Sequence, residues 1–166
     1  MKLLDKIRSQ PGWESNDPSI RVAAVRDLVD DDETQKLLLQ IARDDDDPTV
    51  RSEAIARIDN LGVLASIIES DSDGVVRAEA QGVVRDRVIE AEDATQGELG
   101  VDALTEEHDL VAVARTARLE ALSRAALSRL TDQRALGSVA RRATRRTIAI
   151  EALDKLDDVD EIQAGA

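Results

Sequence analysis

The feature that most constrains this chain is an internal repeat of 26 residues. Residues 104–115 and residues 130–141 share leucine, threonine, leucine, valine, alanine and arginine at matching places. The frame continues at Leu156, another 26 residues on, and it reaches back to Ile58 if about 20 residues are inserted before residue 104. A short period of this kind indicates an array of small units, because each unit buries its apolar face against the next one.

A second motif places alanine and a large apolar residue four positions apart. This spacing is typical of a buried helical stripe. One unit is therefore an A helix ending in this motif, a short polar turn, and a B helix carrying Leu-x-x-Ile/Val-Ala. The five copies of the motif are Ala24–Leu28, Ala54–Ile58, Ala80–Val84, Ala126–Leu130 and Ala152–Leu156.

The pattern predicts helices throughout and no strand, since no segment alternates at period two for long. The helices are expected at residues 3–9, 18–29, 34–43, 48–58, 61–69, 74–92, 104–115, 117–130, 133–142 and 145–156, with a last one from about 159. We predict an all-α fold: a right-handed α-solenoid of about five short helical hairpins, forming one domain over residues 1–166. Residues 85–103 are expected to interrupt the array as an inserted loop, because they fall outside the repeat.

Three helix starts share an aspartate followed by proline or glycine and, four residues after the aspartate, an arginine. Aspartate is a favoured N-cap, and proline is tolerated at the first helical position. Repetition at one register suggests a stacking role, so we expect each arginine to pair with its own or a neighbouring cap. This structural ladder comprises Asp17 and Arg21, Asp47 and Arg51, and Asp73 and Arg77.

The helix pairs that open Asp-Pro-x-Val/Ile-Arg-x-x-Ala, at residues 17–24 and 47–54, resemble HEAT-like repeats. The short unit is most similar to the N-terminal repeats of bacterial proteins that also carry the domain of unknown function 349, and residues 130–141 match best. The resemblance implies an α-solenoid and leaves the function open, because such arrays host scaffolds, nucleic-acid binders and a few enzymes.

The composition argues against catalysis and against a metal or cofactor site. The chain has no cysteine or tyrosine, and its only histidine, His108, lies among acidic residues, where a solvated surface role is expected. The acidic runs at residues 30–33 and 44–47 precede helices, where carboxylates cap N–H groups. We therefore predict no enzyme activity, no cofactor and no dedicated metal site. No apolar run is long enough for a signal peptide or membrane span, which favours a cytoplasmic location.

Charge is unevenly distributed along the chain. Residues 1–110 hold 12 Lys/Arg against 27 Asp/Glu, whereas residues 111–150 hold 9 arginines against two acids. A cluster of arginines in the second block, called here the arginine band, forms a candidate binding surface, although such side chains can also neutralise acidic neighbours. Its members are Arg115, Arg118, Arg141, Arg142, Arg145 and Arg146.

Together these features predict a non-catalytic scaffold that binds a protein partner near residues 85–103 and the arginine band. The alternative is binding of nucleic acid or another polyanion through the band; contacts would then be to phosphates, because aromatic residues for base stacking are nearly absent. Residues 161–166 follow the B-helix register without a polar cap, so we also expect further repeats or self-association at the C-terminal end.

Overall fold

The structure, a computed structural model, describes residues 11–164, with side chains described for residues 11–156. Within that range the protein is all-helical and contains no strand, so the predicted fold class is confirmed at this level. The elements are η1 (Gly12–Glu14), α1 (Pro18–Arg26), α2 (Asp32–Asp44), α3 (Pro48–Ile55), α4 (Leu61–Ser70), α5 (Gly74–Glu90), α6 (Ala94–Ala103), α7 (Glu107–Thr116), α8 (Glu120–Arg129), α9 (Gln133–Arg142) and α10 (Arg146–Ala164). The helix expected at residues 3–9 lies outside the described residues.

Five predicted helix starts are confirmed, each at a residue that follows a capping side chain in the sequence. Helices α1, α3, α4, α5 and α9 begin at the predicted residue, and the residue before each accepts a hydrogen bond from a backbone N–H of the first turn. One prediction at the end of the chain is wrong. Residues 146–164 form the single helix α10, and no break separates residue 156 from residue 159.

Helix α5 continues to Glu90, within the helix predicted at residues 74–92, whereas the prediction of a loop for the rest of residues 85–103 is wrong. Residues 94–103 form α6, whose cap Asp93 accepts from the N–H of Gln96. Helix α6 contacts α4, α5 and α8 and therefore takes a full place in the array. Gly97 and Gly100 are buried where α6 approaches its neighbours closely.

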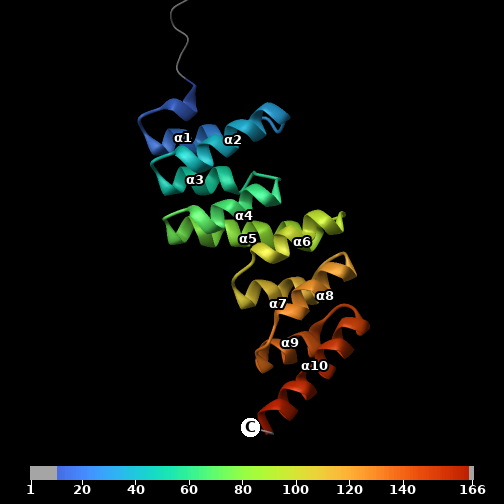
Figure 1. Cartoon of the computed structure of the whole chain (residues 1–166). Helices are drawn as coiled ribbons and strands as arrows, with labels where there is room; N and C mark the ends of the chain where they lie inside the picture. Colours follow the sequence, from blue (N-terminus) through green and yellow to red (C-terminus); the bar gives the residue numbers. More distant parts are fainter. Residues whose placement is uncertain (1–10, 165–166) are drawn as a thin grey trace, which may run out of the picture.

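The helices form two rows, which are visible in Figure 1. Helices α1, α3, α5, α7 and α9 contact one another in that order, and α4, α6, α8 and α10 do so in the second row. Successive helices run back and forth between the rows, so all members of the first row point the same way. Their N-termini share one edge of the molecule, and their C-termini share the opposite edge.

The most extensive helix contacts join α2 to α3, α4 to α5, α7 to α8, and α9 to α10. Each close pair is therefore a B helix followed by an A helix, whereas the sequence analysis paired each A helix with the B helix after it. Three residues, such as Asp45–Asp47, separate the members of each close pair. Three residues also separate α8 from α9, which are not among the closely packed pairs, so the packing of the apolar faces and not the length of the connection selects the partner.

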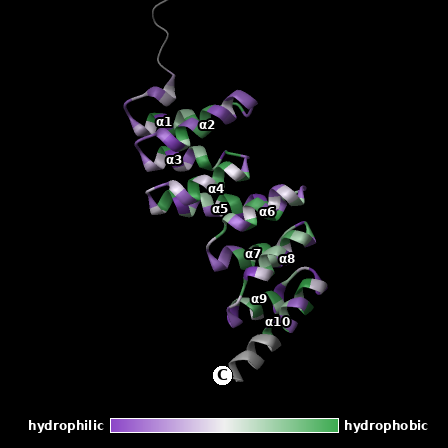
Figure 2. Cartoon of the chain, in the orientation of Figure 1, coloured by the Kyte–Doolittle hydropathy of each residue, from purple (hydrophilic) through white to green (hydrophobic). Residues whose placement is uncertain are grey.

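One continuous apolar core lies between the rows. Leu64, Leu110 and Leu136, which occupy equivalent positions of the repeat, are all buried in this cluster. Figure 2 shows hydrophobic residues along the middle of the molecule and hydrophilic residues at the turns. The three repeated leucines therefore share one buried environment, as burial of one apolar face along the repeat requires.

Candidate functional site

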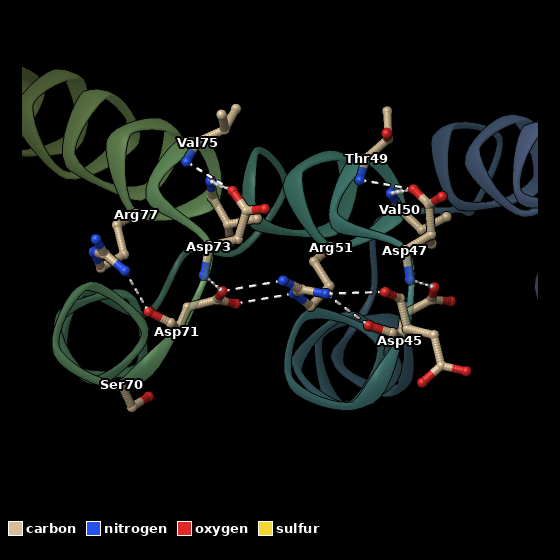
Figure 3. A network of polar contacts seen from close by, with 12 residues as sticks. Asp45, Asp47, Thr49, Val50, Arg51, Ser70, Asp71, Asp73, Val75 and Arg77 are labelled. Atoms are coloured by element: carbon tan, nitrogen blue, oxygen red, sulfur yellow. Dashed lines mark hydrogen bonds and ion pairs between the residues drawn. The ribbon is translucent and has the colours of Figure 1, made fainter.

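The N-terminal edge of the first row is built from acidic turns. Asp47 caps α3, with its Oδ1 2.8 Å from the backbone N of Thr49, and Asp73 caps α5, with its Oδ1 2.7 Å from the N of Val75 (Figure 3). The hydrogen bond from the Thr49 N–H is the main cause that lowers the pKa of Asp47. A charged cap also interacts favourably with the positive end of the helix dipole.

The arginine ladder exists, but its partners differ from those predicted. The Nε and Nη2 of Arg21 lie 2.8 and 2.7 Å from the two carboxylate oxygens of Asp45. Arg51 binds both oxygens of Asp71 in the same way, at 2.9 and 3.0 Å. The expected pairs with Asp17, Asp47 and Asp73 do not form, since those carboxylates are occupied by backbone N–H groups of their own helices.

Arg21 and Arg51 of this ladder also join two successive turns. Arg51 Nη1 donates to the backbone oxygen of Asp45 at 3.0 Å while its other nitrogens bind Asp71 (Figure 3). Arg77 Nη1 donates to the backbone oxygen of Asp71 at 2.8 Å. The hydrogen bond with Asp71 raises the pKa of Arg51, although burial acts against it. The side chains of Arg51 and Asp71 are only 11% and 9% exposed, so this pairing fixes the spacing of neighbouring turns in a partly dry site.

Two open hollows flank the turn at residues 45–47. One has a volume of about 560 Å³ and lies between this turn and Asp71; the other, of about 550 Å³, lies between the same turn and Ser15. Five carboxylates and one guanidinium line the second hollow. Asp44 and Asp46 border both hollows, are exposed, and make no ion pair with any residue that the structure describes. We call residues 44–47 and 71–73 with these hollows the acidic edge.

The arginine band lies at the opposite edge, around the turns at residues 117–119 and 143–145. Some of its arginines form contacts within the fold. Arg145 donates to the backbone oxygens of Ala117, at 2.5 Å, and of Arg118. Arg118 pairs with Glu92 at 2.5 Å. Nε of Arg115 is buried and has no partner among the described residues.

The other three members of the band, Arg141, Arg142 and Arg146, are exposed and form no ion pair with the described side chains. The structure therefore gathers the six arginines at one edge and leaves three of them available to a ligand.

A third set of cations was missed by the sequence analysis. At the fourth position of the alanine motif, Arg57 donates to the backbone oxygens of Val25 and, at 2.7 Å, of Leu28, which end α1. Arg129 and Lys155 occupy the same position and bind the last carbonyls of α6 and α8. Each therefore closes the C-terminus of the preceding helix in its own row. We call this contact the C-terminal clamp; the recurrence of a basic residue at that position was its signal in the sequence.

No constellation of reactive groups accompanies these charges in the described part of the chain. The side chain of His108 is 73% exposed, and its Nε2 lies 3.4 Å from Asp109. Asp109 itself is buried and paired with Arg85 at 3.0 Å, a contact that the sequence analysis did not predict. Over residues 11–164 no group of three or more potential metal ligands gathers, and no helix is long and apolar enough to cross a membrane.

Comparison with models of protein families, with curated proteins and with solved structures finds no match for this chain.

Proposed function

We propose that this chain is a non-catalytic, HEAT-like α-solenoid that serves as a scaffold for a protein partner. The two rows of helices in sequential contact support the solenoid arrangement. The ladder and the clamps tie one repeat to the next, so most partly buried charges are used to hold the array together. Function then depends on the charges that remain on its edges.

The partner segment we propose is rich in lysine and arginine, and it binds along the acidic edge. The observation that carries this proposal is the pair of hollows sharing Asp44 and Asp46, whose carboxylates form no ion pair with a described residue. Arg51 and Arg21 in the same hollows are already neutralised by Asp71 and Asp45. Arg43 also lines the first hollow, whose acids still outnumber its cations. A cationic side chain entering either hollow would gain charge complementarity.

The test is a titration of the whole chain with a synthetic peptide of alternating arginine and serine, followed by fluorescence anisotropy. Asp44→Asn with Asp46→Asn is expected to weaken binding about fivefold, corresponding to about 1 kcal/mol for two exposed charge contacts. The matched control is Glu98→Gln with Asp102→Asn on α6, two exposed acids with no ion pair to the described residues. The same loss in both double variants would contradict the acidic edge as the binding surface.

Nucleic acid is the second candidate, supported by the exposed arginines 141, 142 and 146. A short DNA duplex in the same titration separates the two. Binding that falls steeply with salt and is lost in Arg141→Glu with Arg142→Glu would favour this alternative. Binding of the basic peptide without binding of the duplex favours the scaffold.

A further inference from the structure

The first copy of the alanine motif holds Asp27 at the fourth position, and the copy in α5 also lacks the C-terminal clamp, which leaves none between α3 and α5 in the described part of the chain. The position that holds Arg57, Arg129 and Lys155 in other repeats is Val83 in α5. No described side chain donates to the carbonyl oxygens of Ile55, Ala56 or Ile58, although their counterparts at the end of α1 accept from Arg57. The neighbouring carbonyl oxygen of Arg57 accepts from the neutral amide of Gln35 at 3.0 Å. Among the described residues, cations donate to the carbonyls at the ends of α1, α6 and α8, and none does so at the end of α3.

A cavity of about 460 Å³ lies at this place. Ala56, the C-cap of α3, and Val83 form its apolar part, and residues 86, 87 and 90 of α5 complete the lining. An aliphatic stem can therefore pack on Ala56 and Val83 while its charged end approaches the helix terminus. Long basic side chains commonly bury the stem on apolar surface and keep the charged end in a polar environment.

The charges around the cavity favour a cation. Arg87 pairs with Asp59 at 2.8 Å, whereas Arg85 is shared between Asp86, at 2.8 Å, and Asp109, at 3.0 Å, so these five charges carry one excess negative charge. Glu90 lines the cavity and has no ion pair with a described residue. The carbonyl end of α3 adds a partial negative charge from the helix dipole.

We propose that this cavity binds an arginine or lysine side chain of a partner protein, which supplies in trans the clamp that Val83 omits. The preferred ligand is a guanidinium or ammonium group on an aliphatic stem. The same two groups fill the equivalent positions within the chain, at Arg57, Arg129 and Lys155. The site lies at the C-terminal edge of the first row and does not depend on binding at the acidic edge.

The test is a titration of the isotope-labelled whole chain with N-acetyl-arginine amide, monitored by the methyl signals of Ala56 and Val83 in NMR. N-acetyl-citrulline amide, which has nearly the same shape without the charge, is the control ligand. We expect saturable shifts confined to this cavity with the arginine compound, and several-fold weaker binding of the citrulline compound. No shift at these methyls, or equal affinity for the two compounds, would overturn the proposal.

Two variants distinguish a cavity that binds a cation from one that has no preference for charge. Val83→Arg supplies the clamp from within the chain, so its melting temperature should rise and the Ala56 signal should stop responding to the arginine compound. Glu90→Gln leaves the fold unchanged, because this side chain is exposed, and should weaken binding several-fold. A response in both variants equal to that of the natural chain would contradict the proposal, and the Glu90 result stands even if Val83→Arg does not fold.

Discussion

Replacing Gly100 by alanine should destabilise the protein, although alanine is the better helix former. A methyl group built on Gly100 would lie 2.3 Å from Cγ2 of Val88 and 3.3 Å from Cδ1 of Leu61. Ordinary carbon contacts are about 3.5–4.0 Å, so α6 or Val88 would have to move by more than about 1 Å. Val88 is fully buried in α5 and has a stiff β-branched side chain.

The magnitude follows from two opposing terms. Alanine gains about 1 kcal/mol over glycine in a helix interior, whereas overpacking a tight core costs about 1–3 kcal/mol. Because the clash at Gly100 is with a buried and rigid neighbour, we take the upper end of the cost and expect a net loss of about 1–2 kcal/mol. For a chain of this size that corresponds to a fall in melting temperature of about 3–8 °C.

The same substitution at Gly82 is the matched control with the opposite sign. Gly82 lies within α5, and the nearest atom to an added methyl group is Nη2 of Arg85 at 3.9 Å, the end of a flexible side chain. Gly82→Ala should therefore stabilise the fold by about 1 kcal/mol. Urea unfolding followed by far-UV circular dichroism measures both variants. A Gly100→Ala chain at least as stable as the natural one would refute the close packing of α6.

Two further predictions concern the acidic turns. Arg51→Lys should lower the free energy of unfolding by about 1–2 kcal/mol, because lysine cannot bind both oxygens of Asp71. Arg43→Lys, at an exposed arginine without an ion pair to the described residues, should leave that free energy unchanged in the same urea assay. Equal effects of the two substitutions would contradict the bridging role of Arg51. The pKa of Asp47 is lowered, chiefly by the Thr49 N–H, so its contribution is present above the unfolded pKa of about 3.9 and is lost as pH falls through the folded pKa. Asp47→Asn should accordingly flatten the fall in melting temperature below about pH 5, and an unchanged slope would show that this carboxylate does not titrate with folding.

Local chemistry explains which parts of the fold the sequence predicts. The pairs Asp17-Pro18 and Asp47-Pro48 mark helix starts because cap and first turn interact within four residues. The repeated leucines fall on one face at the helical period, so their burial together was expected. The sequence does not predict which side chains pair across the fold. Arg51 is four residues from Asp47, yet it binds Asp71, 20 residues away. Its own cap was already satisfied by N–H groups, which spacing alone does not reveal.

Helix α6 was not predicted, and its two glycines are compatible with either a loop or a closely packed helix. Gly97 and Gly100 lower helix propensity and are typical of loops. In the folded chain they lie three residues apart on α6, and added methyl groups would lie 2.4 Å from Leu122 Cδ1 and 2.3 Å from Val88 Cγ2. Close approach of the neighbouring helices therefore requires glycine, although glycine has a low helix propensity. The residues that contact these glycines, which are distant in sequence, determine whether the segment is a loop or a helix.

The presence of α6 also explains why acidic and basic surfaces lie at opposite edges. The turns at residues 45–47 and 117–119 belong to equivalent hairpins of the repeat. The first leads into the first row at its N-terminal edge, and the second leads out of that row at its C-terminal edge, because one additional helix separates them. Asp47, beside the first turn, caps the N-terminus of α3, whereas Arg145 donates to a backbone oxygen at the C-terminus of α7, and each charge suits the helix end that it contacts. One additional helix therefore places the acidic turn at residues 45–47 and the arginine-rich turn at residues 117–119 at opposite edges of the molecule.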